Sequence, residues 1–248
     1  MILGPDRAKL SKRHGATTIT EYRKQGYVPA AMINFLALLG WSLDDRTELL
    51  SKEELTKHFS LERVGRTAAI FNKDKLEWMN GVYLRKLSLD EFVREAVPFL
   101  DRDLPESVRR PLDGSFASRV LSLIQERAKT LGEVPQLAGF FFLGELQYDA
   151  SLLLGGKLDA ESAARALAIA SQRLEEVTTW DATTLENILR PLATELNLST
   201  GKFFGLLRVA VTGCTAAPPL FQTMAVLGKE KCLKRLDTGM QVLSTDSN

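Results

Sequence analysis

Cysteine and histidine are scarce in this chain of 248 residues, which has two of each. Cys214 and Cys232 lack the spacing of a metal-binding motif, so no metal site is expected. Two thiols are also too few for the disulfide framework of a small secreted protein. A reducing, cytoplasmic compartment is therefore the expected one.

Long apolar runs are missing as well. The longest candidate is the interrupted stretch from Val134 to Leu143, well short of the roughly 18 residues that a membrane-spanning helix needs. The first residues turn polar too early for a secretory signal. Because 45% of the residues are hydrophobic and 25% are charged, the composition is that of a globular protein and excludes a disordered or fibrous chain.

The formal net charge of +1 hides an uneven distribution. Residues 1–27 contain six Lys or Arg against two Asp or Glu, and residues 201–236 contain six against one. The part between them is therefore acidic. Two interpretations remain open: the basic ends form anion-binding patches, or they are solvated faces without a special role.

Signals for helix ends recur along the chain, and signals for strands are almost absent. A capping box, in which Ser or Thr is followed three residues later by Glu, occurs at Thr18/Glu21, Ser51/Glu54, Ser88/Glu91 and Thr183/Glu186. Pro29 begins an apolar stretch that ends at Gly40, which predicts a buried helix. Apolar residues at helical spacing predict further helices over 115–131, 160–177, 181–196, 202–212 and 220–227. The expected fold is all-α, with about a dozen short helices and no sheet.

The densest polar cluster is the segment from Lys9 to Gly15, which follows a Gly4-Pro5-Asp6 turn. Its cations and hydroxyl suit a mobile loop that closes over a polyphosphate, because a lysine can follow a moving phosphate as a point charge. Such cations would stabilise charge that develops on a departing pyrophosphate. A basic segment without functional consequence is the alternative.

The order of residues in this segment favours the functional interpretation. Lys9-Leu10-Ser11-Lys12-Arg13 resembles the second signature of class I aminoacyl-tRNA synthetases, usually written KMSKS, in the form found in glutamyl-tRNA synthetases. The similarity continues in the right order at residues 26–29, 34–41, 71, 75–80, 180, 207–213 and 226–230. The chain therefore resembles the C-terminal half of bacterial glutamyl-tRNA synthetase, from the signature loop onward.

The resemblance implies a domain order and a function. The signature loop occupies residues 1–15, a helical region that contacts the tRNA stem occupies 16–88, and two anticodon-binding helical bundles occupy 89–140 and 141–248. The implied function is the tRNA-binding portion of an enzyme that attaches glutamate to tRNA(Glu) with ATP. The signature loop, Lys9 to Arg13, is the implied ATP-binding segment.

The family also has a part that this sequence does not show. A nucleotide-binding, parallel-sheet domain with a HIGH-type signature precedes the loop in the family, whereas eight residues precede Lys9 here and no HIGH-like string occurs. We therefore expect that domain to be required in cis, and the 248 residues alone to form no glutamyl-adenylate. ATP with Mg is the implied cofactor of the whole enzyme, none is expected on this chain alone, and a monomer is expected.

Arg127 is the first candidate for reading the anticodon. Its segment, residues 123–131, is similar to the family segment whose arginine reads the third anticodon base, a cytosine. Arginine at this place resembles the type that charges only glutamate tRNA. A guanidinium suits this task because it presents rigid, paired donors to a base edge. The alternative is a surface arginine paired with an acidic neighbour such as Glu126 or Glu133.

A second candidate is the segment from Ala217 to Phe221, which is similar to a family loop that packs against the anticodon. The proline and leucine of that loop correspond to Pro218 and Leu220. Phe221 is expected in the core instead.

Four basic residues that follow are expected to face the tRNA backbone: Lys229, Lys231, Lys234 and Arg235. Affinity should then fall steeply with salt.

The three tryptophans are expected to be structural. Trp41, Trp78 and Trp180 lie in apolar helical contexts and are expected to fill cores rather than to stack on bases.

A different class of function remains the alternative: a stand-alone helical protein-interaction module derived from the same family, with a vestigial signature loop. A preference for glutamate tRNA over glutamine tRNA would distinguish the two.

Overall fold

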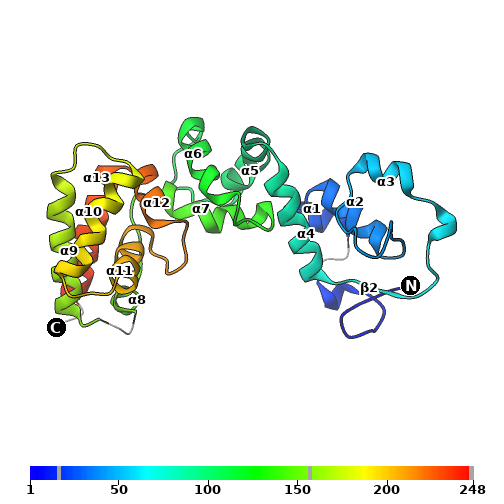
Figure 1. The fold of residues 1–248 in the computed structure, drawn as a ribbon, viewed down its shortest axis with the longest axis horizontal. Helices are drawn as coiled ribbons and strands as arrows, with labels where there is room; N and C mark the ends of the chain where they lie inside the picture. The colour runs from blue at the N-terminus through cyan, green and yellow to red at the C-terminus, as the bar shows by residue number, and fades with distance from the viewer. Residues whose placement is uncertain (16–17, 156–157, 246–248) are drawn as a thin grey trace. The chain divides into compact units, whose positions relative to one another are not determined.

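The computed structural model describes residues 1–15, 18–155 and 158–245 (Figure 1). These residues form thirteen α-helices, three short 3₁₀ helices and one pair of short strands, so the all-α prediction is confirmed. The elements are, in order, β1 (Ile2–Leu3), η1 (Lys12–His14), α1 (Ile19–Lys24), α2 (Pro29–Leu38), α3 (Lys52–His58), η2 (Leu61–Arg63), β2 (Ala69–Ile70), α4 (Lys73–Lys86), α5 (Leu89–Asp103), α6 (Gly114–Ile124), η3 (Leu131–Glu133), α7 (Val134–Phe142), α8 (Ala150–Leu154), α9 (Ala160–Glu175), α10 (Ala182–Glu195), α11 (Thr200–Thr212), α12 (Leu220–Leu227) and α13 (Lys229–Thr245).

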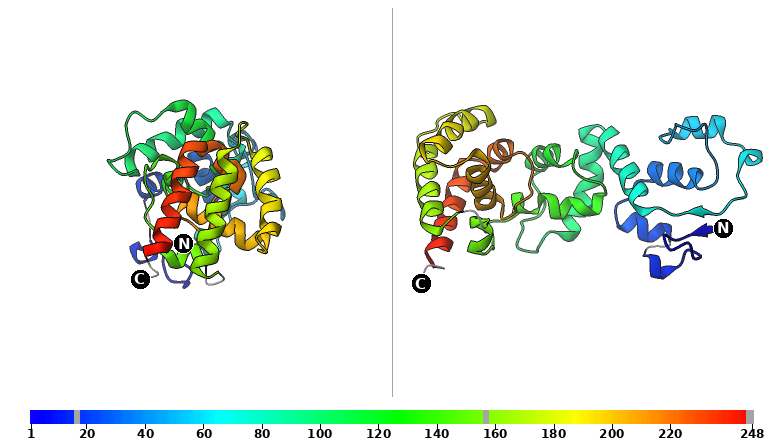
Figure 2. Two further views of the ribbon diagram at one scale, coloured as in Figure 1. Left: turned by 90° about the vertical axis from the view of Figure 1, so that its left-hand side faces the viewer. Right: turned by 60° about the horizontal axis from the view of Figure 1, so that its bottom comes forward.

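The pair of strands is a small departure from the predicted absence of a sheet. β1 and β2 run parallel, with Ile2 opposite Ala69 and Leu3 opposite Ile70, and the two strands lie beside each other in Figure 2. A strand of two residues is too short for alternation of apolar and polar side chains to reveal it.

Contacts divide the chain into two compact units. The first unit comprises residues 1–104 and 124–136, and the second comprises 105–123 and 137–248. Residues 89–140, expected to form the first bundle, are distributed over both units. The predicted domain boundaries therefore remain a proposal.

The core of the first unit is aromatic and lies between α2 and α4. The rings of Tyr22, Tyr27, Phe35 and Phe71 meet in edge-on or tilted contacts, with centroids 5.0, 5.2 and 5.8 Å apart. Met79 of α4 is fully buried against them. Such ring contacts stabilise a fold beyond the area that they bury.

The tryptophans do not all fill cores. Trp41 is 3% exposed and packs with Leu50 and Leu55, as predicted. Trp78 is 45% exposed, so its predicted core position is wrong, because it lies on the outer face of α4 beside fully buried Met79. Trp180 is partly buried and donates its indole N–H to the carbonyl of Met224 at 2.9 Å.

The second unit is a helical bundle in which α9 and α13 lie side by side (Figures 1 and 2). Alanines on the buried face of α9 allow this close approach: Ala163, Ala166 and Ala170. The helices α10, α11 and α12 pack around the pair. None of the described helices combines the length and the hydrophobicity that crossing a bilayer requires.

Three of the four predicted capping boxes are confirmed. They start α1, α3 and α5, with the hydroxyl and the glutamate carboxylate each accepting a backbone N–H. The fourth, at Thr183/Glu186, is wrong because α10 begins two residues earlier. Asp181 is the N-cap residue, and its carboxylate accepts the N–H of Thr184 at 2.9 Å.

Candidate functional site

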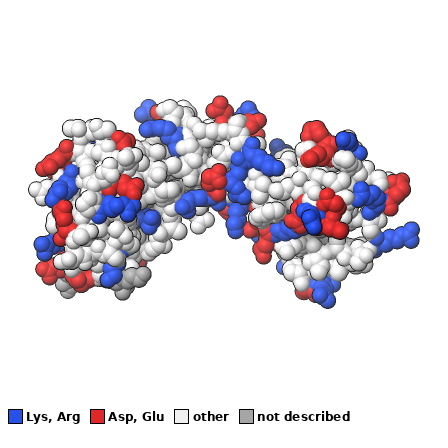
Figure 3. Space-filling model, in the orientation of Figure 1, with Lys and Arg blue, Asp and Glu red and all other residues white. Residues whose placement is uncertain are grey.

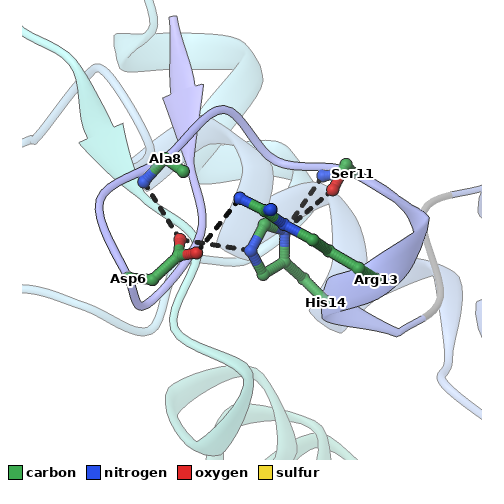
Figure 4. Close-up of polar contacts among 5 residues, drawn as sticks. All are labelled: Asp6, Ala8, Ser11, Arg13 and His14. Atoms are coloured by element: carbon green, nitrogen blue, oxygen red, sulfur yellow. Dashed lines mark hydrogen bonds and ion pairs between the residues drawn. The ribbon is translucent and has the colours of Figure 1, made fainter.

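The loop that resembles the KMSKS signature folds back on β1 (Figure 4). The N–H of Leu10 donates to the carbonyl of Ile2 at 3.1 Å, and the Leu10 side chain packs against the aromatic core. Lys9 and Arg13 remain exposed on the outside of the loop. The side chain of Lys12 lies outside the part that the structure describes. One apolar residue thus anchors a loop whose described cations face solvent.

His14 holds this loop together from the inside. Its side chain is 9% exposed, and its Nδ1 accepts the backbone N–H of Ser11 at 3.1 Å, with the Ser11 hydroxyl 3.3 Å away. A backbone N–H can only donate, so Nδ1 carries no proton and the hydrogen of the neutral ring is on Nε2. Nε2 lies 3.1 Å from Asp6 Oδ1, which is within ion-pair distance although it is not aligned as a hydrogen bond.

Asp6 connects His14 to the rest of the loop. Its Oδ1 accepts the N–H of Ala8 at 3.0 Å, and its Oδ2 lies 3.3 Å from Nη2 of Arg13. The hydrogen bond from Ala8, followed by the interactions with His14 and Arg13, lowers the pKa of Asp6 below its ordinary value. From the sequence His14 counts as one more cation, whereas the structure makes it and Asp6 the organisers of the loop.

The tautomer of His14 can be checked directly. We expect a long-range ¹H–¹⁵N spectrum of histidine-labelled protein to show His14 as a single Nε2–H tautomer at pH values where the ring is neutral. His58 is exposed and is the only other histidine, so it provides an averaged reference signal in the same sample. His14→Ala should speed hydrogen exchange of the Ser11 amide about fivefold, the equivalent of one ordinary hydrogen bond. A mixed tautomer like that of His58 would contradict this arrangement.

Arg127 lies in a turn, not in a helix. The predicted helix over 115–131 ends at Ile124, whose carbonyl accepts the N–H of Arg127 at 2.9 Å. The Arg127 side chain is exposed, and no residue that the structure describes forms a hydrogen bond or ion pair with its guanidinium. Glu133, one of the two expected acidic partners, accepts the N–H of Lys129 instead. The guanidinium is therefore available to a ligand.

Two side-chain amides, one partly buried and one fully buried, hold this turn against α4. The side chain of Gln125 donates to two carbonyls at the C-terminal end of α4, at 2.8 and 2.9 Å. Asn80 is fully buried, donates to the carbonyl of Lys129 at 2.6 Å and accepts the N–H of Val28 at 2.8 Å. These contacts fix the backbone on both sides of Arg127. Asn80 belongs to the family-like segment 75–80, but nothing in the sequence indicates this structural role.

The basic residues of α13 do not form the predicted phosphate-facing stripe. Arg235 is 3% exposed and donates to the carbonyls of Val211, Phe140 and Leu143 at 2.6, 2.7 and 2.9 Å. Burial lowers its pKa to about 10, so it stays charged at neutral pH. Its predicted contact with the tRNA backbone is wrong, because the guanidinium is already bound by helix C-terminal carbonyls.

Its neighbours behave similarly, with one exception. Lys231 donates to the carbonyl of Phe141 at 3.0 Å, and burial lowers its pKa. Lys229 donates to the carbonyls of Glu175 and Val177 at the C-terminal end of α9, at 2.7 and 2.9 Å. Lys234 alone of the four is exposed, with Nζ 3.6 Å from the carboxylate of Glu145. Lys234 is therefore the one candidate of this group whose side chain is exposed to a phosphate, although it lies near Glu145.

The proline segment before α12 is more buried than a simple contact loop would be. Pro218 is buried, Leu220 is 5% exposed, and Phe221 lies in the core as predicted. Pro219 stands between them, is exposed and forms the N-cap of α12. Contact of Pro218 and Leu220 with the anticodon remains a prediction, and Pro219 is the accessible residue of the segment.

Charge is mixed on the molecular surface. On the face drawn in Figure 3, Lys and Arg side chains are interspersed with Asp and Glu side chains in both units. Several cations are also neutralised locally, as Arg13 is by Asp6 and Arg173 is by Glu195. Recognition of an anionic ligand would thus depend on individual side chains more than on a broad positive field.

Comparison with known proteins connects these features. A family model described as the anticodon binding domain matches residues 91–240, and one described as the catalytic domain of class I tRNA synthetases (E and Q) matches residues 1–78. The glutamate–tRNA ligase of Dehalococcoides mccartyi strain CBDB1 is 50% identical over 244 residues, which is 98% of this chain and 50% of that protein. The glutamate–tRNA ligase of Roseiflexus castenholzii is 44% identical over 96% of this chain and 47% of its own length.

Solved structures agree. The crystal structure of a glutamate tRNA ligase from Elizabethkingia meningosepticum superposes with a TM-score of 0.81 at 27% identity, over 98% of this chain and 50% of that one. The chain thus spans about half the length of the relatives that it matches. It belongs to the class I glutamyl-tRNA synthetase family and carries an anticodon-binding domain of that family.

Proposed function

We propose that this chain is the tRNA-binding portion of a glutamate–tRNA ligase and that it selects tRNA(Glu) through its anticodon. The proposal depends on one observation above all: Arg127 presents an exposed guanidinium without a partner among the described residues, on a turn clamped by Asn80 and Gln125. A rigid backbone with a free guanidinium is what base-edge recognition requires. Unpaired anticodon bases can be splayed apart and read in this way.

The cationic side chains of the signature-like loop would bind the phosphates of ATP. Lys9 is an exposed donor, and Arg13 is exposed as well, although its guanidinium is paired with Asp6 and would have to exchange this partner for phosphate. Lysine and arginine are the side chains that bind phosphate, so these residues fit a polyphosphate. Bound ATP, with Mg in the whole enzyme, would activate the glutamate carboxylate. The chain's own part is to hold the loop through Asp6 and His14 and to direct its cations outward.

The 248 residues alone are expected to be catalytically incomplete. The residues that would hold glutamate in line with ATP are not among those that the family resemblance locates here. Purified protein should therefore catalyse no glutamate-dependent pyrophosphate exchange, even with tRNA(Glu) present. Detectable exchange would contradict this part of the proposal.

A gel-shift comparison of glutamate tRNA with glutamine tRNA at moderate salt tests the proposed function. We expect the chain to bind glutamate tRNA more tightly than glutamine tRNA, because it recognises the anticodon. Equal or absent binding of both tRNAs would favour the alternative, a helical protein-interaction module derived from the same family.

Arg127→Ala tests the residue that carries the proposal. If the guanidinium reads the third anticodon base, the substitution should cost about 1–3 kcal/mol for tRNA with cytosine there and little for a uracil variant. Lys129→Ala is the matched control, since Lys129 is an exposed cation of the same turn. Competition gel shifts with both tRNAs measure the difference. An equal loss for cytosine and uracil would show a phosphate contact instead.

A further inference from the structure

Asn80 lies where three segments of the first unit meet that are far apart in the sequence. It is fully buried on α4, its side-chain N–H donates to the carbonyl of Lys129 at 2.6 Å, and its side-chain oxygen accepts the N–H of Val28 at 2.8 Å. One contact needs a donor and the other an acceptor, so the orientation of the amide is fixed. Because Asn80 has no exposed surface, any effect that it has on an RNA ligand must pass through its neighbours.

The two contacts of Asn80 join segments that also hold each other. The segment before α2, residues 25–28, accepts two backbone hydrogen bonds from the segment after Arg127, residues 129–132, at 3.0 and 3.2 Å. Asn80 contacts the last residue of the first segment and the first residue of the second. It therefore closes a ring of hydrogen bonds that ends two residues from Arg127.

α4 also packs closely against the turn beside Asn80. Gly81 follows Asn80 in the helix, and a Cβ on Gly81 would lie 3.4 Å from the Cα of Lys129 and 3.5 Å from the carbonyl oxygen of Ala128. Ala128, the neighbour of Arg127, is itself fully buried. The helix thus fixes the backbone immediately after Arg127 by packing as well as by the hydrogen bond from Asn80.

Base recognition is more sensitive to such positioning than phosphate binding is. A guanidinium reads a base edge through paired donors in a fixed geometry, whereas its attraction to a phosphate persists over a range of positions. In a site that depends on exact geometry, a displacement of about 1 Å can cost on the order of 100-fold. The guanidinium of Arg127 has no partner among the described residues, so the backbone is what positions it.

We propose that Asn80 is a positioning residue for anticodon recognition, and that it sets the preference of Arg127 for cytosine over uracil without touching the tRNA. The inference rests on the proposed function, because it gives Asn80 a part in the base recognition proposed for Arg127. A neutral amide suits this position, since it supplies one donor and one acceptor at once.

Asn80→Ala removes both hydrogen bonds and tests the proposal in competition gel shifts. The ligands are glutamate tRNA and its variant with uracil as the third anticodon base. Wild type should prefer cytosine about 5- to 150-fold, the range expected for one base contact. Asn80→Ala should lower this ratio at least about fivefold, with most of the loss on the cytosine tRNA.

Asn80→Asp adds a readout that a loss of stability cannot imitate. A carboxylate accepts the Val28 N–H but cannot donate to the Lys129 carbonyl, whereas the protonated acid does both. Burial raises the pKa of an aspartate, so the ratio for this variant should rise toward the wild-type value as the pH falls from about 8 to about 5.5. The wild-type ratio, measured at the same pH values, should stay constant.

Asn34→Ala is the matched control for a loss of stability. Asn34 is also a fully buried amide of the first unit, and its side-chain oxygen accepts the N–H of Leu50 at 2.9 Å and the hydroxyl of Tyr83 at 2.8 Å. Neither contact involves the turn that carries Arg127. The control should destabilise the first unit and leave the cytosine preference unchanged, with circular dichroism confirming that each variant is folded at the temperature of the gel shift.

Three results would overturn the inference while leaving the proposed function intact. Asn80→Ala could keep the wild-type ratio, or Asn34→Ala could lower the ratio as much as Asn80→Ala does. Asn80→Asp could also discriminate no better than Asn80→Ala at the lowest pH. A wild-type chain without any preference for cytosine would instead contradict both the proposed function and this inference.

Discussion

Arg235→Ala is expected to lower the free energy of unfolding of the second unit by about 3 kcal/mol. The guanidinium is buried and donates to three backbone carbonyls at the C-terminal ends of α7 and α11. Its removal takes the Arg235 donor from the carbonyls of Val211 and Phe140 in the protein interior, and leaves the Leu143 carbonyl with only Lys231 Nζ at 3.4 Å. Hydrogen bonds to charged groups contribute about 1.5–3 kcal/mol each, and the desolvation of the guanidinium offsets part of their sum.

Denaturant unfolding measures this loss. Trp180 lies in the second unit and Trp41 and Trp78 in the first, so a background with Phe at positions 41 and 78 lets Trp180 fluorescence report the second unit. Arg235→Lys should recover only part of the stability. The lysine ammonium is smaller than the planar guanidinium, so it cannot donate to carbonyls of both α7 and α11 at once.

Lys234→Ala is the matched control for Arg235→Ala. Lys234 is adjacent in sequence and equally cationic, but it is exposed and its pair with Glu145 is long, at 3.6 Å. Exposed pairs of this kind contribute between 0 and about 1 kcal/mol, so the control should be nearly neutral for stability. If both substitutions had the same small effect, Arg235 would not be a structural residue.

Arg235 and Lys234 show that the sequence does not predict which basic residue of a helix is buried. A run of basic residues predicts a basic face, and spacing alone cannot distinguish Arg235 from Lys234. In the helix they point to different sides, and only the packing of α7 and α11 against α13 reveals which side is buried. Long cationic side chains can also bury their stems, so charge by itself is weak evidence of exposure.

Local signals were more reliable for the fold than for the site. Helix starts depend on residues three positions apart, which explains why three capping boxes agree with prediction. The bounds of α12 agree as well, although they were predicted from apolar residues at helical spacing and no side chain caps this helix. The turn that carries Arg127 depends instead on Asn80, which is distant in sequence. The candidate site therefore came from a family resemblance, while its support could come only from the structure.

Gly26→Ala is expected to cost the first unit about 3–5 kcal/mol of stability, because two separate effects add. Gly26 has φ of +85°, a conformation that a side chain disfavours. A Cβ at this position would also overlap the N atom of Gly132 and lie 2.6 Å from that of Leu131, and these are backbone atoms that cannot move aside. The backbones meet this closely because Leu131 N–H donates to the Gly26 carbonyl at 3.0 Å and Gly132 N–H to the Gln25 carbonyl at 3.2 Å.

Gly15→Ala separates the two effects, since Gly15 has φ of +101° but no described atom within 4 Å of the place that a Cβ would occupy. It should therefore show the conformational cost alone, about 1–2 kcal/mol. The contact at Gly26 joins the segment before α2 to η3, four residues beyond Arg127, so Gly26→Ala should also weaken the preference for glutamate tRNA. Unfolding followed by Trp41 fluorescence and the tRNA gel shift measure the two consequences. Equal losses for the two glycines would mean that the backbone contact contributes nothing, and that the Arg127 turn does not depend on it.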